Sequence, residues 1–193
     1  MPWEKSFDLD EATDKAIRIF RQKGYEGTSM SDLISGMGIN KGSLYNAFGN
    51  KKSLFDRALL RYDQLNRQAL LKRLSTIDDP VEAVSQMFDE LIAESKADNQ
   101  FQGCLMVNTA QELPNHPKDV QDMVKASFKE FEEFYRQLIT KGKAAGKIPE
   151  TVNADETAKS LLSLVIALRV LARGTYEPHE LEALKASALR LVH

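Results

Sequence analysis

Apolar residues recur about every three to four positions along most of this chain, and the alternating apolar and polar pattern of a half-buried β-strand is missing. An interval of this length places the apolar side chains on one face of an α-helix. The first clear example is the face formed by Ala12, Ala16, Ile19 and Phe20. The pattern therefore predicts an all-α fold.

Capping residues mark the helix boundaries in the first part of the chain. A serine, aspartate or asparagine before an apolar run is a typical N-cap, and a glycine after the run is a typical end. In two places the N-cap is followed three residues later by an acidic residue, which is the spacing of a capping box: Asp8 with Glu11, and Ser29 with Asp32. The predicted N-caps are Asp8, Ser29, Asn40 and Asn50, and the predicted helix ends are Gly24, Gly38 and Gly49.

The rest of the chain predicts longer helices, separated mainly by prolines. Their expected ranges are about 51–75, 81–97, 104–112, 118–146, 154–174 and 179–192. Together with the three helices before them, these make about nine helices. We expect a small three-helix domain over residues 1–52 and a larger helical domain over residues 53–193.

Composition narrows the class of protein. Hydrophobic residues make up 42% of the 193 residues, enough for a substantial core, and the single cysteine has no partner for a disulfide. The stretch from Trp3 to Asp14 lacks the apolar run of a secretory signal, and the run from Leu161 to Leu168 is too short to span a bilayer. We expect a cytoplasmic protein with no membrane association, no metal and no other cofactor.

The second and third predicted helices have the arrangement of a helix-turn-helix. They are short and joined only by Gly38 and Ile39, so the third helix can project into the major groove of DNA. Side chains that contact bases there are typically small, polar or basic. The candidates are Asn40, Lys41, Ser43 and Asn46, which we expect to face away from the side that carries Leu44 and Phe48.

Three helix N-termini in the same region suit phosphate groups, because free amides and the helix dipole favour an anion there. They begin at Thr28 and Ser29, at Asn40 and Lys41, and at Asn50 and Lys51. The net charge of -2 excludes only a protein that coats nucleic acid without selectivity. Binding to double-stranded operator DNA is therefore the leading interpretation, and simple helix capping by these residues is the alternative.

The same residues resemble the TetR family of bacterial transcriptional regulators. The resemblance lies in the runs from Tyr25 to Ser29, from Gly38 to Tyr45 and from Phe48 to Lys51. It implies a DNA-binding head followed by a helical domain that binds a ligand and forms a dimer. It also implies phosphate contacts from Thr28, Tyr45 and Lys51, close backbone approach at Gly42, and groove contacts from Lys41, Ser43 and Asn46. Partial packing into the core is the other interpretation of Tyr45.

The predicted helix at 154–174 is apolar on nearly all sides, so several neighbours must cover it. A second copy of the chain could cover one face, and a two-fold homodimer would also present two recognition helices to a palindrome. The candidate interface residues are Leu161, Val165, Leu168, Leu181, Leu184, Ala188 and Leu191. Complete burial within one chain is the alternative.

Polar residues within apolar faces of the larger domain could orient a small-molecule effector in an apolar cavity. The polar candidates are Asn108, Gln111 and Arg169, and the apolar ones are Phe88, Leu91, Phe131, Phe134 and Tyr135. The alternative to ligand binding is hydrogen bonding within the chain or at an interface for the polar residues, and simple core packing for the apolar ones.

Cys104 begins the predicted helix at 104–112, where the helix dipole is expected to lower the pKa of its thiol. Similar Gly-Cys-Leu starts occur in some TetR-like regulators that respond to electrophiles, so Cys104 is a candidate for the cavity and for a sensor. An inert packed thiol is the other interpretation.

Taken together, the sequence predicts a repressor that a small-molecule effector releases from its operator, and not an enzyme. A first alternative is a DNA-binding regulator without such an effector, either an activator or one controlled by a protein partner. A second is a cysteine enzyme that pairs Cys104 with His116, although no third catalytic group or oxyanion motif is apparent.

Overall fold

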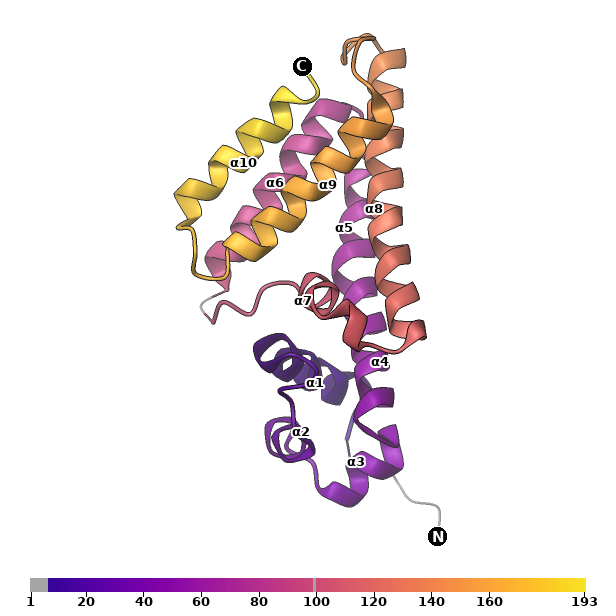
Figure 1. Ribbon diagram of the computed structural model, residues 1–193, viewed down its shortest axis with the longest axis vertical. Helices are drawn as coiled ribbons and strands as arrows, with labels where there is room; N and C mark the ends of the chain where they lie inside the picture. The colour runs from indigo at the N-terminus through magenta and orange to yellow at the C-terminus, as the bar shows by residue number, and fades with distance from the viewer. Residues whose placement is uncertain (1–6, 99) are drawn as a thin grey trace.

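The computed structural model describes residues 7–98 and 100–193 and shows helices without any strand in these ranges (Figure 1). The first six residues of the expected small domain, including the start of the stretch from Trp3 to Asp14, lie outside the described residues. None of the described helices has both the length and the apolar character needed to cross a membrane. The predicted all-α fold is confirmed.

The helices follow the predicted order closely. They are α1 (Leu9–Lys23), α2 (Met30–Met37), α3 (Lys41–Phe48), α4 (Lys51–Asp63), α5 (Ala69–Leu74), α6 (Pro80–Ala97), α7 (Leu105–Gln111), α8 (Lys118–Ala144), α9 (Ala154–Leu171) and α10 (Pro178–Arg190). A π-helical turn, Gln64–Gln68, joins α4 to α5 without a break, and a 3-10 turn, Leu113–Asn115, follows α7. Because α4 and α5 form one continuous helix, the described part of the chain has nine α-helical segments, as predicted.

Side-chain caps start the first four helices where the sequence predicts them. The side-chain oxygens of Asn40 and Asn50 accept hydrogen bonds from backbone amides three residues further on, at 2.8 and 2.9 Å. Ser29 and Asp32 form a complete capping box, and Asp8 caps α1. Each cap satisfies amides that have no partner within the helix.

Two apolar cores occupy the two ends of the molecule. The first lies in the head formed by α1, α2, α3 and α4, and the second lies among α5, α6, α8, α9 and α10 (Figure 1). The head core also includes Leu105 and Met106 of α7 and Val120 and Val124 of α8. The head is therefore packed directly against the larger part of the chain, and does not hang from it by α4 alone.

A buried ion pair lies at the π-helical turn of the long helix. Nε and Nη2 of Arg67 each lie 2.6 Å from the carboxylate of Asp63, and both residues are buried. Ser127 of α8 donates to Asp63 at 3.0 Å, and Arg67 also reaches Glu130 at 2.7 Å. These contacts offset the cost of burying the two charges and tie the long helix to α8.

Five of the seven residues predicted for a subunit interface lie inside a single chain instead. Leu161, Val165 and Leu168 of α9 and Leu181 and Ala188 of α10 are buried in the second core. The faces that carry them are turned toward α6 and α8, against which α9 and α10 pack. These five side chains are thus already covered within one chain, whereas Leu184 and Leu191 keep partial exposure.

Candidate nucleic-acid interface and ligand cavity

Helix α3 presents polar side chains at the outer end of the head. Lys41, Tyr45 and Asn46 are exposed, and Tyr45 is 42% exposed although its side chain is aromatic. Nζ of Lys41 lies 6.0 Å from the centre of the Tyr45 ring. At Gly42, an added Cβ would approach only the side chain of Asn40, at 3.4 Å, so the backbone there is open to a neighbouring molecule. The structure thus brings five of the nine predicted DNA-binding residues to one exposed helix and its cap.

Ser43 and Thr28 differ from the other candidates because both are buried. Ser43 is 7% exposed, so the expectation that it faces outward beside Lys41 is wrong. Helical side chains tilt toward the N-terminus of their helix, which places a residue in the first turn back against the capping residues. Thr28 is almost fully buried, and its hydroxyl donates to the backbone oxygen of Gly24 at 2.6 Å. Ser29 remains exposed as the cap of α2.

Lys51 is held by the loop that joins α1 to α2. Its Nζ donates to the backbone oxygens of Tyr25 and Thr28, both at 3.0 Å, and lies 4.4 Å from the centre of the Tyr25 ring. The ammonium is thus occupied by groups of the protein itself. This positioning role was missed in the sequence, where 26 residues separate Lys51 from Tyr25 and no pattern links them.

His116 lies in an aromatic cluster between the head and the larger part of the chain. Its ring stacks on Phe55 at 5.5 Å and lies 5.4 Å from the ring of Tyr25. Neither ring nitrogen has a hydrogen-bond partner among the described residues, and burial lowers the pKa of the imidazole below its ordinary value. Among the described residues, no hydrogen bond joins His116 to Cys104. The structure therefore does not show the hydrogen-bonded pair that the cysteine-enzyme alternative requires.

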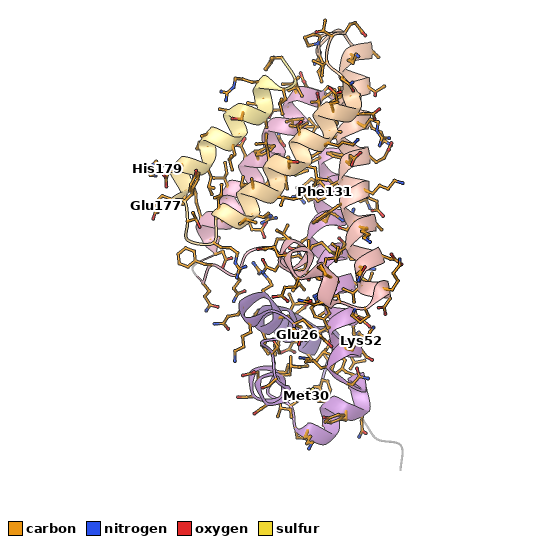
Figure 2. The ribbon with its side chains drawn as sticks, viewed as in Figure 1. Glu26, Met30, Lys52, Phe131, Glu177 and His179 are labelled. Carbon is orange, nitrogen blue, oxygen red and sulfur yellow. The ribbon has the colours of Figure 1, made fainter. Side chains whose placement is uncertain are left out.

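A cavity of about 330 Å³ lies between the long helix, α6, α7, α8 and α9. Four of the nine predicted ligand-binding residues line it, namely Leu91, Cys104, Phe131 and Arg169. Phe131 lies well up α8, away from the head where Met30 is found (Figure 2). The cavity is therefore set apart from the DNA-binding surface but touches the helix that leaves the head.

The other five candidates do not line the cavity. Phe88 and Tyr135 are fully buried in the second core, and Phe134 packs beside Tyr135 with ring centres 5.8 Å apart. Asn108 donates to the backbone oxygen of Gln102 at 2.9 Å. This is the internal hydrogen bonding that we gave as the alternative to ligand binding for this residue. The side chain of Gln111 is exposed. Helical periodicity identifies a buried face, but it does not distinguish a cavity wall from the core behind it.

Most polar groups in the cavity wall come from residues that the sequence analysis did not single out. Tyr62 is 4% exposed, its hydroxyl has no hydrogen-bond partner among the described residues, and burial raises the pKa of its phenol well above the usual range. The buried pair of Asp63 and Arg67 lies in the same wall, and Glu94 faces Arg169. Asp63 and Arg67 are four residues apart, the spacing of an ion pair on one face of a helix, and this spacing was the available signal.

Family models match both parts of the chain. The model described as "Bacterial regulatory proteins, tetR family" matches residues 12–58, and the model described as "Tetracyclin repressor-like, C-terminal domain" matches residues 80–187. The second match alone covers more than half of the chain.

Two curated relatives align over nearly their full length. The uncharacterized HTH-type transcriptional regulator YezE of Bacillus subtilis (strain 168) is 27% identical over 179 residues, which is 92% of each chain. The HTH-type transcriptional repressor ComR of Escherichia coli (strain K12) is 28% identical over 190 residues, 97% of this chain and 90% of ComR. Both relatives are named as transcriptional regulators.

A solved structure of a DNA-bound regulator has the same fold. A cysteine-substituted form of the TetR family transcriptional regulator CifR, complexed with 26-bp double-strand operator DNA, superposes with a TM-score of 0.85. It is 30% identical to this chain, and the match covers 96% of both. A TetR-family regulator from Agrobacterium tumefaciens superposes equally well, with a TM-score of 0.85 at 22% identity, and supports the fold alone.

Proposed function

This chain belongs to the TetR family of bacterial transcriptional regulators, and we propose that it is a repressor that binds a palindromic operator as a homodimer and is released by a small molecule. The observation that carries the proposal is one continuous helix, formed by α4 and α5, that starts directly after α3 in the chain and contributes residues to the cavity wall. DNA contact and ligand contact thus share one structural element.

In this proposal α3 enters the major groove. Lys41 and Asn46 reach base edges, since both are exposed on α3, and the open backbone at Gly42 lets the helix approach closely. Tyr45 and the N-terminal amides of α2 and α4 contact phosphates on either side. Lys51 contributes by fixing the loop before α2. The operator complex of CifR supports this mode of binding through its similarity to the present chain.

The ligand acts through the long helix in this proposal. The boundary that we propose between a DNA-binding domain (1–52) and a ligand-binding domain (53–193) falls at the start of that helix. A ligand changes the position of the head only if it binds two arrangements of the helix with unequal affinity. The cavity touches both sides of the π-helical turn, through Tyr62 and Asp63 before it and Ala69 and Leu70 after it.

We propose that the homodimer forms through the outer faces of α9 and α10. Exposed small residues lie there, including Ser163 in α9 and Ala183 and Ala186 in α10, and small side chains let helices of two subunits pack closely. Substituting Ala186→Arg should give a monomer in sedimentation at micromolar concentration, whereas Ala126→Arg, at an exposed position of α8, should leave the dimer intact. A wild-type monomer would contradict the proposed dimer.

The experiment that tests the function is selection of bound sequences from a random pool of DNA duplexes by the purified chain. Recovery of a palindrome supports a dimeric operator-binding regulator, because two-fold related heads select two-fold related half-sites. Failure to enrich any sequence would contradict the proposal. Titration of the selected site with candidate effectors then tests release.

A further inference from the structure

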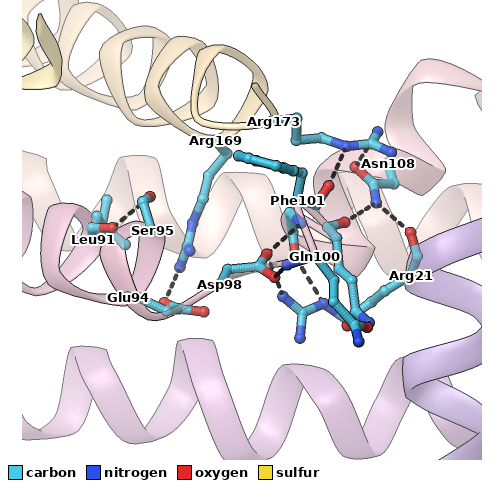
Figure 3. Close-up of polar contacts among 12 residues, drawn as sticks. Arg21, Leu91, Glu94, Ser95, Asp98, Gln100, Phe101, Asn108, Arg169 and Arg173 are labelled. Carbon is cyan, nitrogen blue, oxygen red and sulfur yellow. Dashed lines mark hydrogen bonds and ion pairs between the residues drawn. The ribbon is translucent and has the colours of Figure 1, made fainter. Parts of the chain in front are cut away.

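Arg169 is the charged group in the cavity wall with the most unused hydrogen-bonding capacity. Its side chain is 11% exposed, and Nη2 lies 2.8 Å from the carboxylate of Glu94 (Figure 3). No other ion pair or hydrogen bond joins Arg169 to the described residues, although a guanidinium has five N–H donors and stays protonated in proteins. Glu94, by contrast, is 40% exposed. The guanidinium is thus fixed in the wall while its partner can turn to solvent.

Tyr62, which belongs to α4, supplies a second unused hydrogen-bond donor to the cavity that Arg169 of α9 also lines. Its hydroxyl is buried and has no partner among the described residues, although Tyr62 and Arg169 line one cavity. A buried hydroxyl without a partner is unfavourable by about 1–3 kcal/mol. Because both residues line the same cavity, a bound molecule that carries acceptor oxygens could accept hydrogen bonds from both.

The rest of the wall is mainly apolar, with its other charges already paired. Arg67 is buried and neutralises Asp63, and Arg73, which pairs with Glu90, has a side chain that is 58% exposed. Among the arginines that line the described wall, Arg169 is therefore the one that is largely buried and holds a single, partly exposed carboxylate. The apolar side chains around it include Leu91, Met106, Phe128, Phe131, Leu162 and Ile166. The site therefore has room for an apolar body and charge complementarity for one negative group.

We propose that the effector is a small apolar carboxylic acid whose carboxylate displaces Glu94 from Arg169 and accepts a hydrogen bond from Tyr62. A single carboxylate matches the single guanidinium that becomes available. A dianion would leave one negative charge without a partner in a largely apolar cavity. This inference names the ligand class of the cavity and rests on the proposed function only for its effect on DNA binding.

The displaced carboxylate lies close to the contacts that hold the head. Asp98, one turn after Glu94 in sequence, contacts Arg21 of α1 at 3.4 Å, and Nε of Arg21 donates to the backbone oxygen of Gly103 at 2.7 Å (Figure 3). Arg21, Glu94, Asp98 and Arg169 line one small pocket at the end of α6. Release of Glu94 adds a free carboxylate beside Arg21, which changes the contacts between α1 and α6.

Calorimetry on the 193-residue chain tests the ligand class with three acids, benzoate, octanoate and 4-phenylbutyrate, each compared with its matching alcohol. At least one acid should bind about tenfold or more tightly than its alcohol, because a hydrogen bond to a charged group is worth more than one to a neutral group. Glu94→Gln should tighten acid binding severalfold, since it removes the competing carboxylate. Arg169→Met should abolish the preference for the acid.

Asp89→Asn is the matched control, because Asp89 lies on the same helix in an ion pair with Lys185 and does not line the cavity. It should leave acid binding unchanged. The inference is overturned if no acid binds more tightly than its alcohol, or if Glu94→Gln weakens acid binding or leaves it unchanged. Glu94 is partly exposed, so this variant keeps the test valid even if Arg169→Met fails to fold.

Operator binding, measured without ligand, separates this inference from the proposed function. A protein that binds a selected operator but none of the acids would retain its function and overturn the inference. A protein that binds an acid with the expected response to Glu94→Gln, but selects no DNA sequence, would support the inference and contradict the proposed function.

Discussion

The ammonium of Lys51 lies 4.4 Å from the centre of the Tyr25 ring, which joins the first turn of α4 to the loop between α1 and α2. The same ammonium donates to two backbone oxygens of that loop, at Tyr25 and Thr28. A cation over an aromatic face and charged hydrogen bonds to carbonyls are both stabilising. The contact fixes where α2 begins relative to α4, and α3 lies between these two helices in the chain.

Lys51→Met should therefore act on the stability of the head. The substitution keeps the aliphatic stem but removes the ammonium, and we expect the free energy of unfolding to fall by roughly 1–2 kcal/mol. Urea denaturation measures this change. The slope of operator affinity against salt concentration should stay nearly constant, because the ammonium is already bound by the protein.

Lys41→Met is the matched comparison, since Lys41 is exposed on α3. It should leave stability unchanged and reduce the salt slope by about one. A reduced slope with unchanged stability in Lys51→Met would instead identify Lys51 as a direct phosphate contact, as the sequence alone suggested.

Two neighbouring residues of α3 should differ in their effect on sequence recognition. Asn46→Ala should change which base pairs the protein prefers, with a mismatch-sized effect of about 1–3 kcal/mol at one position of each half-site. Ser43→Ala should leave the preference unchanged, because Ser43 is buried. Binding selection with each variant checks both outcomes. An altered preference in Ser43→Ala would mean that α3 changes its packing on DNA.

Local signals in the sequence were sufficient to predict the helices of the head. The caps at Ser29, Asn40 and Asn50 act through bonds to residues three positions away, so their effect is visible in a short window. The π-helical turn at Gln64–Gln68 was not predicted. A π-helical turn contains one residue more than an α-helical turn. The spacing of apolar residues over a long helix changes too little for such a single extra residue to be noticed.

The positions of residues in the site depend on packing between distant helices, and this limited the prediction. Leu91 and Phe88 are both buried residues of α6, three positions apart, yet of these two only Leu91 lines the cavity. Likewise, Leu161 and Leu168 belong to an all-round apolar helix, and the sequence could not decide whether its own chain or a partner covers them. Whether such a residue lines a cavity, a core or an interface depends on residues that are distant in sequence.

Arg67 is expected to be far more sensitive to substitution than an ordinary ion-paired residue. Arg67→Met leaves the buried carboxylate of Asp63 without its cation, and such a loss typically lowers the free energy of unfolding by about 3–5 kcal/mol. The double variant with Asp63→Asn and Arg67→Met should recover much of the loss, because no buried charge remains. Denaturant unfolding of the two variants checks this, and equal stability of the single and double variants would contradict the explanation.

Acid should weaken the contact between the head and the larger part of the chain through His116. Burial between aromatic rings lowers the pKa of His116 in the folded protein, whereas the unfolded chain has a pKa of about 6.5. Above that value neither state binds a proton, and stability does not depend on His116. Below it the unfolded chain takes up a proton that the folded chain does not, so the free energy of unfolding falls until the folded pKa is reached.

His116→Phe should therefore remove part of the loss of stability between about pH 7 and pH 5, where an unfolded histidine titrates. The aromatic ring preserves the stacking on Phe55 and contains no group that can take up a proton. His179→Phe, at an exposed position of α10 outside this aromatic cluster, is the matched control for replacing a histidine by phenylalanine. Urea midpoints measured across this pH range give the slopes. If His116→Phe and wild type lost stability in parallel over this range, His116 would not be the source of the acid sensitivity.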